Sequence, residues 1–529
     1  MGEKIFIDRK EKNTKVILDG FDAKIFTGFA DELKKRDIDI IYWIGGKKPF
    51  NEFSKDKIKY PATIFHPLHD VVLGISAPGV DTTSFPPVGK GLVDSLLGCE
   101  AKALSMMNLF DTESTVPLIQ KKHTYYTALK YWQGIFKATK PDAIFFDDIP
   151  HKPHNTIMYH LAKKEGIRTL MFKRTQIDNK VLFFDDIQDY KNLRIEYDRI
   201  NKNGDANLSD LSINSQKYYK RYCVDAHADK TLPYMQKEIF EGRFRSYYKG
   251  FPSARSIVRV LKMGTLPSAI KTYAQMYFGK KRSPVLEKAK HRGFYLKWRE
   301  CKNNKTKAAF KKKYERLQKK IDFSNKFVYV PLHYQPECST SGMGDIFTDQ
   351  ILMIDLVRAV LPKGWFIYVK ENPLQWKDPL GAMGRFSGYY QEIADMKNVY
   401  LIPAETSTFD LIKNSQAVAT VTGSAGWEAL LFDKPAFLFG YTWYMHCDGV
   451  FGVTNVSECK YAMEKIAEGY KPNKQKILNY IAAVDTIGVP GFHSALFKKA
   501  YAVAYNLIIS NEENTKNIAE GFSKELQKN

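Results

Sequence analysis

The chain has 529 residues, of which 44% are hydrophobic and 14% aromatic, and this composition excludes an intrinsically disordered protein. Its net charge is +22, and its six cysteines lack CxxC spacing, which argues against a zinc site or a disulfide framework. No apolar run approaches the ~18 residues that span a bilayer, and the charged N-terminal segment is unlike a signal peptide, so we expect a cytoplasmic protein.

Residues 1–190 alternate between short apolar runs and amphipathic stretches, which is typical of a Rossmann-like α/β domain. Four strands are predicted in this region, at 15–18, 38–44, 143–146 and 169–172. The helices between them are predicted at 23–35, 124–138 and 154–165, the last one ended by Gly166.

Two adjacent carboxylates, Asp147 and Asp148, directly follow the predicted strand 143–146, and His151 lies close behind them. A carboxylate pair at a strand end can raise the pKa of one member, which suits a general base or a nucleophile. We therefore predict Asp147, Asp148 and His151 as catalytic residues. The alternative is that the aspartates only cap the next helix. A second FFDD sequence, at 183–186, is interpreted as loop or capping sequence.

Residues 191–322 are rich in Tyr, Lys and Arg, and we interpret them as a helical insertion or linker between two domains. Between Lys280 and Lys320 there are 17 basic and 3 acidic residues. This charge fits a solvated helical face, a contact with an anionic membrane or glycan, or a nucleic-acid patch. Because no nucleic-acid motif accompanies it, we expect no nucleic-acid partner.

Residues 323–475 alternate in the same way and predict a second Rossmann-like domain, in which we expect a nucleotide to bind. The apolar run KFVYVP is followed by a helix at 345–360 and by strands at 365–369, 399–402 and 417–421. This order predicts a doubly wound parallel sheet, whose ligands bind beyond the carboxyl ends of the strands.

Three segments fall at that edge of the predicted sheet. The small-residue turn after strand 417–421 opens a helix whose free N–H groups favour a phosphate. Two strand-end loops add polar side chains and flexible backbone. The predicted nucleotide-sugar-binding residues are His333, Gln335, Lys370, Glu371, Asn372, Pro373, Thr422, Gly423, Ser424, Ala425, Gly426 and Glu428, with Glu428 on the ribose hydroxyls. The alternative is an ordinary set of turns and surface loops.

Residues 476–529 are predicted to be C-terminal helices that pack back on the domains, with a polar tail from Ser510 that frays. Two Rossmann-like domains that face a cleft, with returning C-terminal helices, form a GT-B-like α/β fold. That fold class is our prediction for the chain.

Three motifs, PLHYQPECSTSGMGDIFTDQ, YVKENP and TVTGSAGWEALLFDKPAFLFG, resemble in order and approximate spacing the capsule polysaccharide biosynthesis family, which includes bacterial Kdo transferases. The resemblance implies a GT-B glycosyltransferase with a nucleotide-sugar donor, CMP-linked in preference to UDP-linked, and a glycan or glycolipid acceptor. IFFDD resembles the acidic motif of bacterial sialyltransferases, where it carries the catalytic base, but Ile149 replaces the usual glycine. Asn372 stands where the resembling families place a histidine before Pro373, and an amide cannot carry an imidazolium's charge.

We expect no metal and no cofactor, because a helix dipole and basic side chains can stabilise a leaving phosphate. The basic segment 280–320 would place a cytoplasmic enzyme in peripheral contact with the inner membrane face. Two alternatives stay open: a nucleotide-sugar epimerase of the same fold, and a non-catalytic glycan-binding assembly protein.

Overall fold

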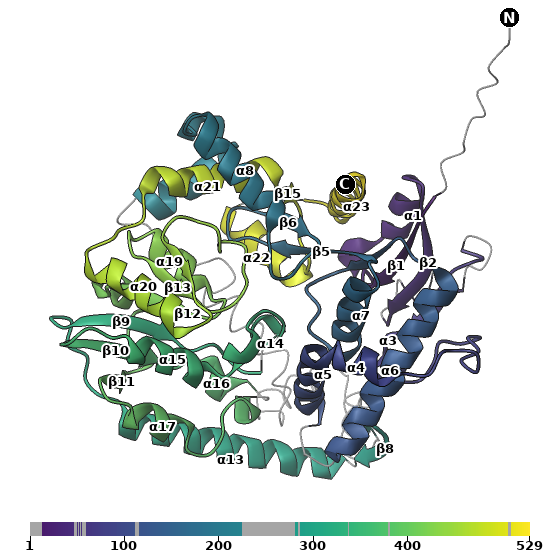
Figure 1. Cartoon of the computed structure of the whole chain (residues 1–529), viewed down its shortest axis with the longest axis horizontal. Helices are drawn as coiled ribbons and strands as arrows, with labels where there is room; N and C mark the ends of the chain where they lie inside the picture. Colours follow the sequence, from purple (N-terminus) through teal and green to yellow (C-terminus); the bar gives the residue numbers. More distant parts are fainter. Residues whose placement is uncertain are drawn as a thin grey trace, which may run out of the picture.

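The computed structural model of the chain describes residues 13–46, 60–111, 116–224, 281–283, 286–291, 293–336, 338–378, 381–505 and 509–528, together with positions 50, 52, 54 and 55. Two β-sheets flanked by helices form two α/β halves, and a small two-stranded sheet accompanies them (Figure 1). The predicted fold class, a GT-B-like α/β protein with two Rossmann-like domains, is confirmed.

The first sheet has seven strands in the order β15-β6-β5-β4-β1-β2-β3. β1 to β5 run parallel, β6 runs antiparallel to β5, and β15 runs antiparallel to β6. The central strands are buried on both faces, as expected for near-continuous apolar runs between helical layers. Their bounds are β1 Thr14–Asp19, β2 Ile38–Gly45, β3 Ile64–Pro67, β4 Ala143–Phe146, β5 Arg168–Arg174, β6 Lys180–Phe184 and β15 Val489–Pro490.

The second sheet has six parallel strands in the order β11-β10-β9-β12-β13-β14. They are β9 Lys326–Pro331, β10 Trp365–Lys370, β11 Val399–Leu401, β12 Ala417–Thr420, β13 Ala436–Leu438 and β14 Val450–Gly452. When the strands are numbered separately within each half, both sheets contain the strand order 3-2-1-4-5-6. The order therefore reverses between β1 and β4 in the first sheet and between β9 and β12 in the second. Ligands of doubly wound sheets bind at such switch points.

The helices of the first half cover both faces of its sheet. They are η1 Lys24–Phe26, α1 Phe29–Lys34, α3 Leu68–Leu73, α4 Lys90–Asp94, α5 Leu97–Phe110, α6 Leu118–Thr139 and α7 Pro153–Lys164. The single helix predicted at 23–35 is divided into η1 and α1, because Gly28 takes a φ of +85° before α1 begins. A residue with a Cβ would be strained in that conformation.

The segment between the two sheets contains α8 Lys191–Asn203, η2 Leu208–Asp210, α9 Ile213–Tyr219, the π-helical turn η3 Lys220–Val224 and α13 Gly293–Leu317. It also contains a hairpin, β7 Lys281–Ser283 and β8 Leu286–His291, which the all-helical prediction lacks. α8 packs against α21 Lys474–Ile487 through the rings of Tyr197 and Tyr480. Much of the predicted insertion, 225–280, lies outside the described residues.

The helices of the second half are α14 Cys338–Met343, η5 Asp345–Thr348, α15 Gln350–Ala359, α16 Leu374–Lys377, η6 Gly381–Met383, α17 Tyr389–Asp395, α18 Thr408–Asn414, α19 Ser424–Leu430 and α20 Val456–Ala467. The helix predicted at 345–360 is divided into η5 and α15. Asp349 causes the division, because its carboxylate accepts a hydrogen bond from the Ile351 amide and caps α15.

The prediction that the chain frays from Ser510 is wrong. Ser510 caps α23 Asn511–Gln527, whose Ile518 and Phe522 are fully buried against the first sheet. The Phe522 ring stacks on Phe145 at 4.3 Å and meets Phe183 edge-on at 4.9 Å. The tail is polar on average, but its apolar residues fall on one helical face. With α22 Ala495–Tyr505, α23 forms the last part of the chain.

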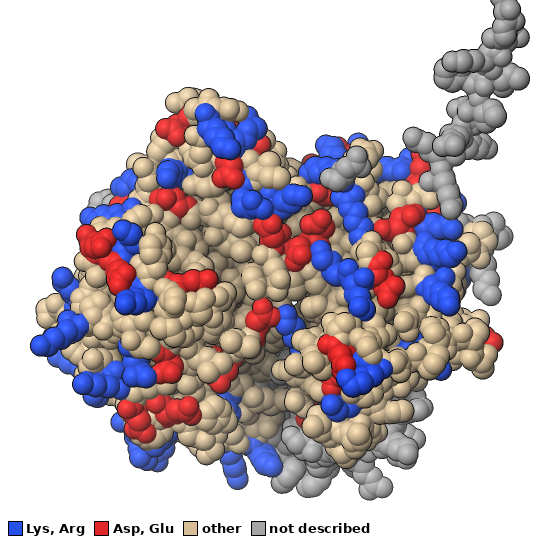
Figure 2. Space-filling model, viewed as in Figure 1, with Lys and Arg blue, Asp and Glu red and all other residues tan. Residues whose placement is uncertain are grey.

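Basic and acidic side chains are interspersed over the face of the molecule drawn in Figure 2, and the surface is hollowed between the two halves. Within the described residues, no helix combines the length and the apolarity needed to cross a bilayer.

Candidate active site

The first candidate site lies at the switch point of the first sheet. Asp19 ends β1, and Asp147 follows β4, the neighbouring strand. The Asp147 carboxyl group packs directly on Gly20, where a Cβ would lie 2.1 Å from Asp147 Cγ. Its Oδ2 accepts a hydrogen bond from the Phe21 amide at 3.2 Å. Gly20, with a φ of +92°, is therefore required for this close approach.

The half-buried Asp147 has a strongly raised pKa. Burial raises the pKa to about 7, Lys152 opposes the rise, and the neighbouring carboxylates of Asp19 and Asp148 add to it. A carboxyl group with a pKa near the working pH can both accept and return a proton. Asp147 is therefore the member of the predicted pair suited to act as a base.

Asp148 differs from its neighbour because it has a cationic partner. Lys173 Nζ lies 2.8 Å from Asp148 Oδ1. Burial is the largest influence and raises the pKa of Asp148, but Lys173, His493 and His151 together outweigh it and hold that pKa below its usual range. Environments that separate the pKa values of two carboxyl groups assign them different roles. Asp148 is therefore held in its ionised form, whereas the pKa of Asp147 is that of a group able to exchange a proton.

His151 lies beside this pair in the loop that follows β4. Its Nδ1 donates to the Ile149 carbonyl at 2.6 Å, which leaves Nε2 as the acceptor nitrogen. Burial lowers the pKa of His151, although Asp148 raises it. A histidine that the sequence did not predict, His493, comes from the segment before α22 and faces Asp148 as well.

The second candidate site lies at the switch point of the second sheet. There His333, in the loop after β9, contacts the end of β12. Its Nε2 accepts the Val421 amide at 3.2 Å and lies 2.9 Å from Thr420 Oγ1. Because a backbone amide can only donate, His333 is neutral and carries its proton on Nδ1. Burial, assisted by the charge of Arg385, lowers the pKa of His333 to about 4.

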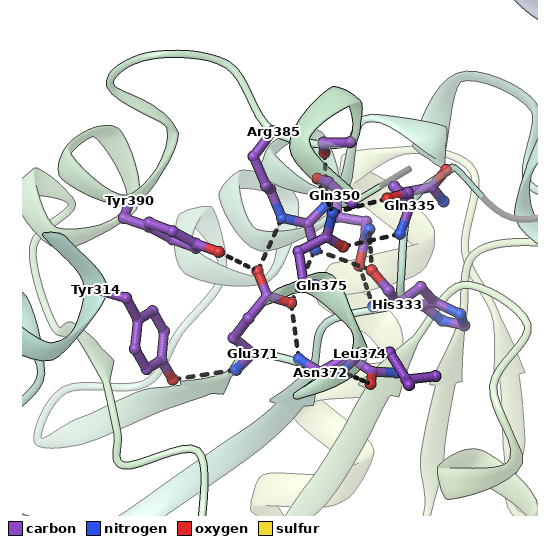
Figure 3. Close-up of polar contacts among 12 residues, drawn as sticks. Tyr314, His333, Gln335, Gln350, Glu371, Asn372, Leu374, Gln375, Arg385 and Tyr390 are labelled. Carbon is purple, nitrogen blue, oxygen red and sulfur yellow. Dashed lines mark hydrogen bonds and ion pairs between the residues drawn. The ribbon is translucent and has the colours of Figure 1, made fainter. Parts of the chain in front are cut away.

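Glu371 does not face a ligand, and its prediction as a binding residue is corrected. The side chain is fully buried, and Arg385 binds both carboxylate oxygens, at 2.8 and 2.9 Å (Figure 3). Tyr390 and the Asn372 amide donate to the same group at 2.6 and 2.7 Å. Its acceptor capacity is occupied, so Glu371 instead fixes the loop after β10. Arg385 extends this support by donating to the His333 carbonyl at 2.9 Å.

The other predicted loop residues contribute through their backbone or as caps. The Gln335 backbone exchanges two hydrogen bonds with the Gln375 side chain, at 2.9 and 2.7 Å. Asn372 Oδ1 accepts the Leu374 amide at 3.0 Å and so satisfies the first amide of α16, whereas Pro373 is exposed. Gln375 and Arg385 are supports that the sequence did not predict, because neither belongs to a recognisable motif.

Lys370 and Glu428 lie beneath the turn that follows β12, and each shifts the pKa of the other. Lys370 Nζ donates to the Thr406 carbonyl at 2.8 Å and to Thr408 Oγ1 at 2.6 Å. Burial lowers the pKa of Lys370 to about 8, although Glu428 raises it. Burial raises the pKa of Glu428 to about 7, opposed by the Ser424 hydroxyl and Lys370. Each side chain is only 8% exposed, so both sit under the turn.

The predicted turn itself requires small residues. A Cβ on Gly423 would lie 3.0 Å from His333 Cε1, and one on Gly426 would lie 2.5 Å from the Tyr444 hydroxyl oxygen. Ala425 and Gly426 are buried, whereas Thr422, Gly423 and Ser424 are half-buried. Thr422 Oγ1 is buried without a hydrogen-bond partner among the described residues.

α14 lies between the two candidate sites. A Cβ on Gly342 would lie 3.0 Å from the Pro150 carbonyl oxygen of the loop after β4. At the other side of α14, the Tyr441 amide donates to the Met343 carbonyl at 2.9 Å. Trp427 Nε1 of the second half also donates a hydrogen bond, at 2.8 Å, to the hydroxyl of Tyr218 in α9, which belongs to the segment between the two sheets. The two sites therefore belong to one connected region.

Among the residues that the structure describes, no three His, Cys, Asp or Glu side chains gather as a metal-binding group. Whether the protein needs a metal or a cofactor stays a prediction.

A family model described as "Capsule polysaccharide biosynthesis protein" matches residues 350–479 of this chain. The segment runs from α15 into α21 and includes five strands of the second sheet. The resemblance predicted from the sequence motifs is confirmed for this part of the chain.

The chain is also 36% identical over 78 residues to the capsule polysaccharide modification protein LipA of Neisseria meningitidis serogroup B. The match covers 15% of this chain and only 10% of LipA. Among solved structures, KpsC of Thermosulfurimonas dismutans, a beta Kdo 2,7 transferase, aligns at 15% identity and a TM-score of 0.24, over 44% of this chain and 67% of that chain. The UDP-GlcNAc 2-epimerase of Neisseria meningitidis aligns at 10% identity and a TM-score of 0.22, over 98% and 100%. TM-scores this low support no functional conclusion.

Proposed function

We propose that this chain is a glycosyltransferase of surface polysaccharide assembly that moves a sugar from a nucleotide donor to a glycan or glycolipid acceptor. The observation that carries the proposal is the carboxylate pair at the first switch point, whose pKa values are pushed apart and which α14 connects to the second switch point. The family match over residues 350–479 supports a role in capsule-type polysaccharide synthesis. A CMP-linked, Kdo-like donor is favoured over a UDP-linked one.

In this proposal, the donor binds to the second half. His333 Nδ1–H, the Thr422 hydroxyl and the turn from Gly423 to Gly426 receive the donor phosphate, and Glu428 lies beneath the ribose. The ion pair of Glu371 and Arg385 keeps the His333 loop in place. Helix dipoles and neutral donors stabilise the leaving phosphate, so we propose that transfer needs no metal ion.

The first half would supply the base or nucleophile. As a base, Asp147 takes the proton of the acceptor hydroxyl while the hydroxyl oxygen bonds to the anomeric carbon and the nucleotide leaves with the bonding electron pair. As a nucleophile, the Asp147 carboxylate bonds to the anomeric carbon while the nucleotide leaves with the bonding electron pair. The acceptor oxygen then displaces Asp147 from that carbon, and the proton of the acceptor hydroxyl passes to the released carboxylate. In both routes Asp148 keeps its charge through Lys173.

The basic residues of α13 would hold the enzyme near anionic lipid. α13 carries exposed basic residues along its length: Lys302, Lys305, Lys311, Lys312 and Arg316. The helix is fastened to the second half by the buried Tyr314, whose hydroxyl donates to the Ile402 carbonyl at 2.5 Å. Each basic residue near an anionic surface adds about 1 kcal/mol of attraction.

The test measures nucleotide release from CMP-Kdo, CMP-N-acetylneuraminate and UDP-GlcNAc in the presence of capsular oligosaccharide acceptors. Asp147→Asn should lower transfer roughly 100-fold or more, the usual contribution of a positioned base, and leave nucleotide affinity unchanged. Asp185→Asn is the matched control. It lies in the second FFDD sequence, but antiparallel β6 ends at the opposite edge of the sheet.

Two outcomes would contradict the proposal. Exchange of a sugar ring proton without nucleotide release would indicate an epimerase. Nucleotide and glycan binding without turnover, unaffected by Asp147→Asn, would indicate a glycan-binding assembly protein.

Transfer that is abolished by EDTA and restored by Mg²⁺ would contradict the proposed independence from metal.

A further inference from the structure

A cavity of about 130 Å³ opens in the first half, between α3, α6 and the loop that follows α3. Its walls are apolar and largely aromatic, and include Val71, Phe85, Tyr131 and Trp132. Neither the proposed donor site nor the carboxylate pair uses any of these residues.

The walls of this cavity are fixed by a chain of buried hydrogen bonds whose direction can be assigned. His66 Nε2 lies 2.8 Å from the Ile75 carbonyl and must donate to it, so Nδ1 accepts from the Tyr42 hydroxyl at 2.6 Å. Tyr42 in turn accepts from Tyr131 at 2.8 Å, and Tyr131 accepts the Ala77 amide at 3.1 Å. Burial lowers the pKa of His66 to about 4, so the chain is complete at neutral pH and the cavity is preformed.

The cavity is slightly smaller than a site known to hold one unsubstituted six-membered ring, so it can take the face of a ring while the ring's substituents stay at the opening. An engineered apolar cavity of ~150 Å³ in another protein binds one benzene molecule. The lining also includes polar residues that reach solvent: Thr127 is exposed, and Thr82 and Lys130 are half-buried. A pyranose ring matches this arrangement, because its C–H faces are apolar and its hydroxyl groups project from the perimeter.

Lys130 adds a preference for negative charge. Two other lysines of α6, Lys121 and Lys122, form ion pairs with Asp111 and Glu100. No ion pair among the described residues involves Lys130. An acidic group on a ring in the cavity would therefore meet an available cation at the rim.

The cavity lies along the same sheet edge as the carboxylate pair. His66 on β3, Ile44 on β2, Asp19 on β1 and Phe146 on β4 are successive register partners in one row across the sheet. Three strand spacings separate the ends of this row, or about 14 Å. That distance exceeds one sugar ring, so a ring in the cavity belongs to a sugar unit several positions from the reacting one.

We propose that this cavity is a distal acceptor subsite that holds one acidic sugar ring of the growing glycan. The inference rests on the proposed transferase function for its place in the reaction, but the binding of the sugar does not depend on turnover. The subsite would make the enzyme prefer acceptors that are long enough to reach from Asp147 to the cavity.

The first experiment measures binding of free sugars to the full chain by saturation-transfer NMR, with glucuronate, N-acetylneuraminate, glucose and cytidine as probes. We expect signals from the two acidic sugars, weaker signals from glucose and none that depend on the cavity from cytidine. Thr127→Trp, which fills the opening from α6, should abolish the acidic-sugar signals, and Lys130→Ala should weaken them about tenfold. His123→Trp and Lys137→Ala are controls at exposed positions of α6 that do not line the cavity.

The second experiment measures transfer to capsular oligosaccharides of increasing length. Thr127→Trp should raise KM for long acceptors and leave kcat, the donor KM and transfer to the shortest acceptor unchanged. The proposal would be overturned if Thr127→Trp still bound acidic sugars or if the wild type did not bind them. Binding of cytidine in the cavity would overturn it as well. Asp147→Asn separates the two proposals, because sugar binding to this variant should be intact. A chain that binds the sugars but never transfers one would keep the subsite and refute the transferase.

Discussion

At Asp147, the same burial that suits a base costs stability. The folded pKa is about 7, against an ordinary value of 3.8, so the folded state holds a proton that the unfolded chain releases. The contribution of Asp147 to the free energy of unfolding is therefore most favourable in acid and falls as the pH rises from about 4 to 7. Asp147→Asn removes this loss and should stabilise the protein at pH 8 by about 2 kcal/mol, after allowance for partial exposure. Urea unfolding at several pH values measures the difference.

Asp148→Asn serves as the control, because its effect on the free energy of unfolding at neutral pH should have the opposite sign. The pKa of Asp148 is held below its usual range, so its ion pair with Lys173 stabilises the fold above the unfolded pKa and is lost on acidification. The variant should be less stable than the wild type at neutral pH, and the difference should shrink in acid. Equal behaviour of the two asparagine variants would mean that the two carboxyl groups share one environment.

Only part of the candidate site could be predicted from the sequence. Asp147 and His333 follow buried apolar strands, and parallel strands bring their carboxyl ends to one edge, so position along the chain was sufficient. Arg385 comes from an irregular loop and His493 from a distant segment, and neither has a motif or a strand to locate it. Glu371 was assigned to the ligand because the sequence does not show the arginine that occupies both of its oxygens.

At the scale of elements, the strands that the sequence predicted lie close to observed strands, but β3, β6, β14 and β15 were not predicted. The interpretation of the second FFDD sequence as loop or capping sequence is wrong for Phe183 and Phe184, which end β6. Helix ends were predicted less closely. Strand β4 has the predicted bounds, because a fully buried parallel strand reads as an uninterrupted apolar run. Two helices were predicted as continuous although a single residue interrupts each of them: Gly28 divides one and Asp349 divides the other. The C-terminal tail was judged by average polarity, although Ile518 and Phe522 are one helical turn apart and face the core.

α23 should therefore contribute strongly to the stability of the first half. Phe522 is fully buried among the rings of Phe21, Phe145, Phe172 and Phe183. Phe522→Ala should lower the free energy of unfolding by about 3 to 5 kcal/mol, because it removes buried surface and leaves a cavity. Lys524→Ala, on the exposed face of the same helix, should change it by less than about 0.5 kcal/mol. Equal unfolding midpoints for the two variants would show that α23 is not docked in solution.

At the scale of the whole molecule, the proposed chemistry needs the two switch points to face each other at a fixed separation. α14 packs closely on the loop that carries the carboxylate pair, because Gly342 faces the Pro150 carbonyl with little room for a side chain. A Cβ at position 342 would already lie 3.0 Å from the Pro150 carbonyl oxygen. The branched side chain of valine therefore cannot be placed without moving the two halves apart.

Gly342→Val should therefore impair transfer without unfolding either half. A displacement of ~1 Å far from the reacting atoms can cost about 100-fold in rate, and we expect a loss of that order in kcat. Nucleotide affinity should persist, because the His333 site lies within the second half. Gly98→Val is the control, since a Cβ at Gly98 meets no atom within 4 Å. Transfer at the wild-type rate by a folded Gly342→Val protein would show that the reaction does not pass through this arrangement of the two halves, and the assignment of Asp147 to a sugar held by the other half would fall with it.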